Sequence, residues 1–396
     1  MRNAEFKGWV RAAGEGFEAH PKIPHSAFRI PHLFVVKLLI AGGGTGGHLM
    51  PALVLAQVAA AAGHDVTLVG AERGIEAQIL PRYPFHFHLL PMEPLYRRTW
   101  WRNFRWPVIA VHAWRSAGRV LREEQPAIVI GTGGYAAGPV VLRAQLAGIP
   151  TALQEQNAFP GLTTRLLARR ARQVHLGFPE AERKLSPGPR TKVFLFGNPI
   201  APPGHVDAHA ARAEFGLHSE RRTLLIMGGS QGARALNETV VRALDRGSLG
   251  DVNLLWSTGA LNEPLYASRS VAGRIVVRGF FDPISAAYAA ADLVVARAGA
   301  MTVAELCAWG KPSVLVPLPT AAADHQTFNA QALTTAGASV LLLERELDPV
   351  SLAKTVGVLI QDSARLDALG KSARKRGHPN AARNIMEKVL ELSQVA

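Results

Sequence analysis

A glycine-rich run at residues 42–47 constrains the fold more than any other feature, because it separates a strand pattern from a helix pattern. The apolar residues 38–41 before it predict a short buried strand. The apolar segment 51–62 after it predicts a helix, with a proline suited to the first turn. A glycine turn in this setting points backbone N–H groups and the positive end of a helix at an anion. The run therefore predicts a phosphate-binding loop, with a tight turn in any α/β protein as the alternative.

Two further glycine loops follow apolar strands later in the chain. One covers residues 131–135 after a strand at 127–130, and the other covers residues 228–233 after a strand at 224–227. Each lies between a strand and a helix, and the last is in the other half of the sequence. A single phosphate-binding loop does not need three such turns, so the pattern predicts two Rossmann-like domains that face each other across a cleft.

The alternation of strands and helices restarts after residues 198–204, a linker rich in proline. Alternating elements imply a parallel sheet in each half, so the predicted class is α/β with two doubly wound domains. We expect domains at 35–197 and 205–370, a C-terminal helix at 371–396, and a poorly ordered arm at 1–34. Predicted strands cover 38–41, 65–70, 127–130, 151–153, 193–196, 223–227, 252–256, 275–278, 292–296, 313–316 and 339–342, and predicted helices include 108–123, 138–147, 160–170 and a tail from 349.

Composition restricts the class of protein. A chain of 396 residues with 48% hydrophobic and 19% charged residues can build a core in each half. The single cysteine, Cys307, excludes an internal disulfide and is expected to be a small buried hydrophobe. No apolar run approaches the roughly 20 residues of a bilayer span, and no signal peptide is recognisable, so we expect a cytoplasmic protein. The net charge of +14 favours polyanionic partners: nucleic acid, phosphorylated substrates or an anionic membrane surface.

Residues 96–106 interleave aromatic rings with arginines. Rings that dip beneath lipid headgroups and cations that pair with lipid phosphates suit a membrane interface. Single-stranded nucleic acid also stacks on such rings, and core tryptophans with snorkelling arginines are a third interpretation. We favour membrane contact, through Trp100, Trp101, Phe104, Arg105 and Trp106.

Two residues of the first half are candidates for acid–base chemistry. His48 ends the first glycine loop, where an imidazole could take a proton from an attacking hydroxyl or could merely stabilise the loop. The polar run 154–157 follows the strand at 151–153, and polar groups at a strand's carboxyl end usually face a ligand. Glu155 is therefore a second possible base, with a structural carboxylate bonded to loop amides as the alternative.

The second half offers groups suited to a nucleotide sugar. The helix predicted to start at 300–302 would present amides to a diphosphate. Glu305, about one turn in, could hold ribose hydroxyls, or it could be a charge that is favourable near a helix N-terminus. Residues 324–329 begin another helix with amide and imidazole groups that suit sugar hydroxyls.

Sequence patterns for metal and ATP chemistry are missing from the chain. It contains no Asp-x-Asp, no Cys/His cluster with zinc spacing and no complete Gly-x-x-x-x-Gly-Lys-Ser/Thr loop. A departing nucleotide diphosphate would need helix dipoles, loop amides and Ser230 to take up its charge. We therefore expect no metal and no other cofactor.

Six motifs, taken in order, resemble the MurG family of bacterial N-acetylglucosaminyltransferases, glycosyltransferase family 28. They lie at residues 43–48, 133–135, 155–157, 197–199, 228–233 and 299–305, and the resemblance covers about residues 36–390. It implies a GT-B fold whose C-terminal helix crosses back to the N-terminal domain. It also implies transfer of N-acetylglucosamine from UDP-N-acetylglucosamine to lipid I, the undecaprenyl-diphosphate-linked N-acetylmuramyl-pentapeptide, which yields lipid II for peptidoglycan.

The resemblance also implies a set of contacts. The donor would lie mostly on the second domain, with uracil on the backbone of Phe281, ribose on Glu305 and the sugar near Gln326. The implied donor contacts are Thr45, Gly46, Gly47, Asn157, Ser230, Phe281, Ala300, Met301, Thr302, Val303, Ala304, Glu305, His325 and Gln326, and the implied contacts of the acceptor diphosphate are Gly44, Gly133, Gly134 and Tyr135.

The implied reaction is an inverting displacement that needs no metal. The 4-hydroxyl of N-acetylmuramic acid attacks the anomeric carbon of the donor, and UDP leaves. His48 is the first candidate for the base and Glu155 the second. The stretch at 96–106 fits peripheral docking on anionic lipids at the cytoplasmic face of the cell membrane, and nucleic acid is not an expected partner.

Two departures from the family pattern and three alternatives accompany this prediction. Ala201 stands where the family usually carries arginine, and the leader before Val36 is unusual, so a start near Val36 is a hypothesis. Another GT-B enzyme, such as a glycolipid glycosyltransferase or a UDP-sugar epimerase, is the first alternative. A basic nucleic-acid-binding protein is the second. A nicotinamide dehydrogenase is weaker, because the Gly-x-Gly-x-x-Gly spacing is missing.

Overall fold

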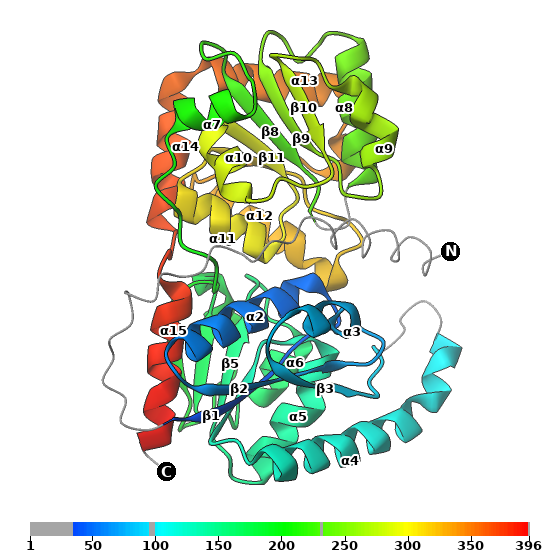
Figure 1. Ribbon diagram of the computed structural model, residues 1–396, viewed down its shortest axis with the longest axis vertical. Helices are drawn as coiled ribbons and strands as arrows, with labels where there is room; N and C mark the ends of the chain where they lie inside the picture. The colour runs from blue at the N-terminus through cyan, green and yellow to red at the C-terminus, as the bar shows by residue number, and fades with distance from the viewer. Residues whose placement is uncertain (1–34, 95–99, 230–232, 395–396) are drawn as a thin grey trace. The chain divides into compact units, whose positions relative to one another are not determined.

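The structure is a computed structural model that describes residues 35–94, 100–229 and 233–394. The described chain divides into two compact units (Figure 1). The first contains residues up to 201 together with 380–394, and the second contains residues 202–379. Each unit is a parallel sheet covered by helices.

The first unit is built on a seven-stranded parallel sheet in the order β3-β2-β1-β4-β5-β6-β7. The strand order reverses between β1 and β4, so the loops that leave these two strands lie side by side at a topological switch point. The strands are β1 (Lys37–Ala41), β2 (Asp65–Ala71), β3 (His86–Leu90), β4 (Ile128–Gly131), β5 (Thr151–Glu155), β6 (Gln173–Leu176) and β7 (Lys192–Leu195).

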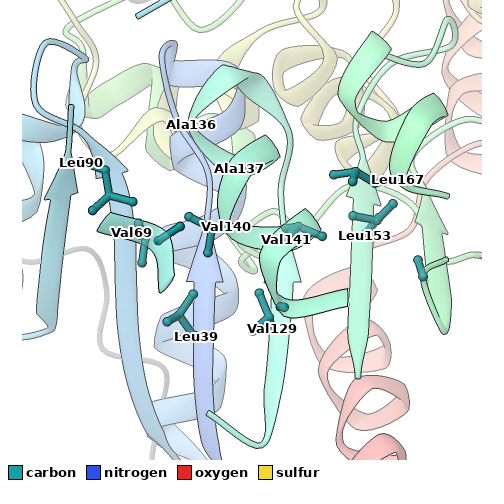
Figure 2. Close-up of a cluster of buried hydrophobic side chains, with 14 of the residues drawn as sticks. Leu39, Val69, Leu90, Val129, Ala136, Ala137, Val140, Val141, Leu153 and Leu167 are labelled. Carbon is teal, nitrogen blue, oxygen red and sulfur yellow. The ribbon is translucent and has the colours of Figure 1, made fainter. Parts of the chain in front are cut away.

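Apolar side chains from the middle of this sheet form the core shown in Figure 2. Leu39, Val69 and Val129 project from neighbouring strands against helix α5, which contributes Val140 and Val141. The C-terminal helix α15 packs against α2 in the same unit (Figure 1). The helices of the unit are α2 (Gly46–Ala61), α3 (Glu76–Ile79), α4 (Trp106–Glu124), α5 (Gly134–Leu146), α6 (Leu162–Leu167) and α15 (Ala381–Leu390).

The second unit repeats the plan with six parallel strands in the order β10-β9-β8-β11-β12-β13. Its order reverses between β8 and β11. The strands are β8 (Thr223–Met227), β9 (Asn253–Ser257), β10 (Ile275–Arg278), β11 (Leu293–Ala296), β12 (Ser313–Leu315) and β13 (Val340–Leu341). The helices are α7 (Ala208–Glu214), α8 (Arg234–Asp245), α9 (Glu263–Tyr266), α10 (Ile284–Ala290), α11 (Ala300–Trp309), α12 (His325–Thr335), α13 (Pro349–Gln361) and α14 (Ser363–Lys375).

The predicted pair of doubly wound parallel sheets is confirmed, and the differences are local. Strands β3 and β6 were not predicted, because each mixes histidine or glutamine with apolar residues and so lacks a clear apolar run. Helix α2 begins at Gly46 and not at Pro51, which places His48 in its first turn. The helical tail predicted from residue 349 is divided into three helices, α13, α14 and α15. Gly377 and Pro379 lie between α14 and α15.

Among the described residues, no helix has both the length and the apolar character that a transmembrane span requires.

Candidate active site

The loops that follow β1 and β4 are in direct contact through their glycines. Gly134 has a φ of +77°, and a Cβ added there would lie 2.0 Å from the carbonyl oxygen of Gly43. Gly44 has a φ of +85°, and a Cβ there would lie 2.4 Å from the ring of Tyr135. Only glycine permits both the backbone conformation and the close approach. The predicted grouping of Gly44, Gly134 and Tyr135 in one place is therefore found in the structure.

His48 is half-buried in the first turn of α2, and its environment defines the tautomer of the imidazole. Its Nδ1 lies 3.1 Å from the carbonyl oxygen of Thr132 and 2.9 Å from Oε1 of Gln156. A carbonyl oxygen can only accept a hydrogen bond, so in the neutral ring Nδ1 carries the proton. Nε2 is then left with a lone pair, which is the state required of a general base.

The orientation of the Gln156 amide is defined by its other contacts. Its Nε2 donates to the carbonyl oxygens of Thr132, at 2.7 Å, and of Gln154, at 3.0 Å. These acceptors assign the nitrogen, so Oε1 must be the atom that faces His48. The amide group therefore acts as an acceptor for the imidazole N–H.

A buried polar network lies behind His48. Gln154 in β5 and Gln156 immediately after it are 0% and 1% exposed. Gln154 donates from Nε2 to Oδ1 of Asn198 at 2.9 Å, and Asn198 donates from Nδ2 to the carbonyl of Gln156 at 3.0 Å. The expectation that this polar run faces a ligand is corrected for the two glutamines, because both are buried and hydrogen-bond to each other and to groups inside the fold.

Glu155 lies on the opposite side of β5 and is 2% exposed. Its carboxylate accepts hydrogen bonds from the main-chain N–H of Asn157 at 3.1 Å and of Gly161 at 3.0 Å. The side chain of Asn157 donates to the same carboxylate at 3.3 Å. This is the arrangement of a structural carboxylate that holds a loop, the alternative considered for Glu155 from the sequence.

A buried carboxyl group beneath the first glycine loop was not predicted. Glu76, at the start of α3, is fully buried, and its Oε1 accepts a hydrogen bond from the N–H of Gly44. Burial raises the pKa of Glu76 to about 6, and hydrogen bonds from main-chain N–H groups offset part of that effect. A Cβ at Gly43 would overlap this carboxylate. The residues next to Glu76 in the sequence do not indicate that its carboxyl group is buried, because the tertiary fold brings together the groups that bury it.

In the second unit, a short loop that ends at Gly299 connects β11 to helix α11. Its first turn contains Ala300, Met301 and Thr302, the residues predicted to offer amides to a diphosphate. Ala300 is 8% exposed, so a ligand contact at that position would involve the main chain. The N-terminus of α11 therefore lies at the carboxyl edge of the sheet, where anions bind in this class of fold. Of the other predicted residues in α11, Val303 is buried and Ala304 is half-buried.

Glu305 is tied to a buried tyrosine. Its Oε2 accepts a hydrogen bond from the hydroxyl of Tyr288 at 2.8 Å, and Tyr288 is fully buried. Burial raises the pKa of Glu305, and the hydrogen bond from Tyr288 opposes that shift. Tyr288 was not predicted, although it orients the carboxylate expected to hold ribose.

Two further predicted donor contacts, His325 and Gln326, are the first residues of α12, and Phe281 follows β10. Gln326 accepts at Oε1 from the main-chain N–H of Leu318 at 3.0 Å, and His325 bonds through Nδ1 to the carbonyl of Ala322. The ring of Phe281 is 5% exposed and packs edge-on against that of Phe215, so its side chain belongs to the interior of the unit. Ser230 lies outside the described residues.

Arg297 is a third residue that was not predicted from the sequence, after Glu76 and Tyr288. It is 6% exposed, directly after β11, and donates from Nη1 to the carbonyls of Val316 and Pro317, both at 3.2 Å. Its other terminal nitrogen forms an ion pair with Glu344. Arg297 therefore fixes the loop after β12 relative to the loop that leads into α11. An arginine immediately after an apolar strand was the available signal.

The predicted membrane segment has an apolar exposed side. Trp101 is 57% exposed, Phe104 is 76% exposed, and Val108 and Val111 on α4 are 61% and 47% exposed. Arg105 is exposed and Trp106 is half-buried, whereas the side chain of Trp100 is outside the described set.

The described residues also contain one group of three side chains that could bind a metal ion, contributed by a strand and a helix far apart in sequence. Local Cys/His spacing could not reveal it.

Comparison with known proteins places this architecture in one family. The family model described as the glycosyltransferase family 28 N-terminal domain matches residues 38–176, and that of the family 28 C-terminal domain matches residues 223–385. A UDP-N-acetylglucosamine–N-acetylmuramyl-(pentapeptide) pyrophosphoryl-undecaprenol N-acetylglucosamine transferase of Chlorobaculum parvum is 41% identical over 91% of this chain and 100% of its own. The protein of the same name from Myxococcus xanthus is 40% identical over 90% of this chain and 93% of its own.

Solved structures agree with the sequence comparison. The crystal structure of Acinetobacter baumannii MurG has a TM-score of 0.72 and 30% identity, and the match covers 90% of this chain and 99% of that one. The calicheamicin glycosyltransferase CalG4 has a TM-score of 0.65 at 17% identity, which shows the fold alone. Two family 28 domains and relatives of about 40% identity over nine-tenths of the chain lead to one conclusion: this chain belongs to the MurG family of glycosyltransferases and has the GT-B fold.

Proposed function

We propose that this chain transfers N-acetylglucosamine from UDP-N-acetylglucosamine to a lipid-linked N-acetylmuramyl-pentapeptide diphosphate. This acceptor is the one that appears in the names of its relatives. The observation that carries the chemistry is the pairing of two glycine loops with His48, whose Nδ1 bonds to the carbonyl of Thr132. The loops supply main-chain amides for an acceptor diphosphate, and the histidine supplies a base beside them.

In the proposed step, Nε2 of His48 takes the proton from the 4-hydroxyl of N-acetylmuramic acid. The hydroxyl oxygen forms a bond to the anomeric carbon of the donor as the bond from that carbon to UDP breaks, with inversion. The imidazolium that forms keeps its Nδ1–H bonded to Thr132 and Gln156, which stabilises the positive charge. UDP leaves with the bonding electron pair.

Glu155 is less suited to this role than His48. Both oxygens of its carboxylate already accept main-chain N–H groups, and the side chain is almost completely buried. A carboxylate whose oxygens are both engaged with loop amides is poorly placed to take a proton from a substrate hydroxyl. We therefore assign Glu155 to holding the loop at residues 155–161.

We further propose that the charge of the departing diphosphate is taken up by amides at the N-terminus of α11 and by Ser230, without a metal ion. Gly44, Gly133, Gly134 and Tyr135 are assigned to the diphosphate of the acceptor. Glu305, oriented by Tyr288, is assigned to the ribose of the donor. His325 and Gln326 are assigned to the transferred sugar.

The exposed apolar side of the segment from Trp101 to Val111 supports docking on the cytoplasmic face of an anionic membrane. Its exposed residues Trp101, Phe104, Val108 and Val111 recur at intervals of three or four, the spacing of one helical face. Exposed Arg105 supplies a cation in this segment, and exposed Arg115 and Arg119 supply cations farther along α4. A membrane-bound enzyme would meet a lipid-linked acceptor by diffusion in the plane of the bilayer.

UDP release from UDP-N-acetylglucosamine, with and without a lipid I analogue, tests the proposed function. We expect release to depend on the analogue and to yield a product that carries both sugars. His48→Ala should lower kcat by about 10²–10⁴-fold, the usual contribution of a general base, with little change in the KM of the donor. His112→Ala, which alters an exposed histidine on α4, is the matched control.

Two results would overturn the proposal. An unchanged kcat in His48→Ala would remove His48 from the role of base. Equal UDP release without the acceptor analogue would indicate a hydrolase or an epimerase in place of this transferase.

A further inference from the structure

Three metal-ligating side chains meet at the outer edge of the sheet in the first unit. His86 and His88 come from β3, and Glu124 is the last residue of α4. Nε2 of His88 lies 2.6 Å from Oε1 of Glu124, and Nδ1 of His86 lies 3.2 Å from the same oxygen. The three ligand atoms are all within 4.8 Å of one another. None of these residues has a part in the proposed reaction.

The fold explains why these side chains converge. Among the described strands β3 pairs with β2 alone, so it lies at the edge of the sheet. His86 and His88 are two residues apart and therefore lie on the same face of the strand. Thr67 of β2 is the register partner of His86, so its side chain is on that face as well. Helix α4 packs on β3 and ends over this group at Glu124.

A neighbouring hydroxyl orients the carboxylate. Thr67 donates from Oγ1 to Oε2 of Glu124 at 2.9 Å, which leaves Oε1 directed at the two imidazoles. An outer hydrogen bond of this kind is the usual device that aims a carboxylate at a metal ion. The residues thus form a two-histidine, one-carboxylate set with its carboxylate already positioned.

The place of Glu124 in its helix supports the same conclusion. A carboxylate in the last turn of a helix faces the negative end of the helix dipole, which is unfavourable. A bound cation at this point would reverse that interaction and would also neutralise the carboxylate. His86 has 64% of its side chain exposed, so the cluster is open to solvent on one side and has room for a water ligand.

We propose that His86, His88 and Glu124 bind a zinc ion, with water as the fourth ligand. Two imidazole nitrogens and one carboxylate oxygen suit Zn²⁺, whereas Mg²⁺ and Ca²⁺ prefer oxygen ligands throughout. Ligand atoms of a tetrahedral zinc site are about 3.3 Å apart, a spacing that small side-chain rotations would produce here. The ion would fasten the last turn of α4 to the edge strand. It is separated from β1, the strand that leads to His48, by β2.

Isothermal titration of the tag-free, chelator-treated full chain with ZnCl₂ tests the site. We expect one site per chain, and no comparable binding of MgCl₂. His86→Gln should weaken the zinc affinity by at least about tenfold, because it removes a ligand. The side chain of His86 is exposed, so we expect this variant to fold like the wild type. Thr67→Val should weaken the zinc affinity by about 10–100-fold through loss of the outer hydrogen bond. His112→Gln, an exposed histidine on the same helix, should leave it unchanged.

Cobalt substitution supplies a second measurement that is independent of affinity. Co²⁺ in the wild-type chain should show the intense visible absorption of a four-coordinate site, and His88→Gln should lose it while keeping the wild-type far-UV circular dichroism. Zinc binding that is equal in wild type and in a His86→Gln, His88→Gln double variant would overturn the proposal. So would the absence of a stoichiometric site in the wild type, and the cluster would then be a hydrogen-bonded group only.

Discussion

The buried carboxyl group of Glu76 makes the stability of the first unit depend on pH in a direction that can be calculated. Burial raises its pKa from 4.5 to about 6 in the folded chain. The folded state therefore binds the proton more tightly than the unfolded state does. The stabilisation is fully present below pH 4.5 and is lost as the pH rises through about 6.

The size of the effect follows from the shift. A change of one pKa unit corresponds to 1.36 kcal/mol, so a rise from 4.5 to about 6 corresponds to about 2 kcal/mol. Glu76→Gln keeps an oxygen that can accept from the N–H of Gly44 but does not titrate. The free energy of unfolding of the variant, minus that of the wild type, should therefore increase by about 2 kcal/mol between pH 4 and pH 7.

Hydrogen exchange of peptides from β1 and α2 in graded urea, read by mass spectrometry, measures this difference for the first unit separately from the second. The comparison of wild type and variant cancels the titration of every other group. A difference that stays constant across the pH range, or one that falls as the pH rises, would refute the assignment of a buried, proton-binding Glu76.

Three further outcomes are expected. Gly134→Ala should reduce kcat/KM for the acceptor analogue by at least about tenfold in the UDP-release assay. The added Cβ would lie 2.0 Å from a main-chain carbonyl oxygen and would force the two loops apart. Wild-type kinetics in this variant would contradict the prediction. Arg297→Met should destabilise the second unit by about 3 kcal/mol, because it leaves Glu344 without its ion-pair partner. Hydrogen exchange of β12 peptides measures this loss, and an unchanged exchange pattern would count against the prediction. Phe104→Ser should reduce co-sedimentation with anionic vesicles, whereas Val350→Ser, at an exposed valine of the second unit, should not; equal loss in both would argue against the proposed docking segment.

Local sequence was sufficient to predict the class of fold and the place of the glycine loops. Strand, glycine loop and helix recur around residues 42, 131 and 228, and a short apolar run followed by glycine has few other stable conformations. The positions of His48 and Glu305 after such strands were also predictable, because the carboxyl ends of parallel strands lie at one edge of a sheet.

The roles of particular side chains depended on neighbours distant in sequence. Whether Glu155 or His48 was the better base could not be decided from the sequence, because both follow predicted strands. The structure shows the partners of each group: loop amides occupy both carboxylate oxygens of Glu155, whereas Nδ1 of His48 bonds to a carbonyl 84 residues away.

The amino-acid sequence by itself determined two doubly wound domains, their glycine loops and the family to which the chain belongs. The tertiary structure alone decided which polar groups are buried together, as in Glu76 beneath Gly44 and His88 beside Glu124. The physical reason is that backbone preferences act over a few residues. The burial and partners of a carboxyl or imidazole group are set by strand register and helix packing across the whole domain.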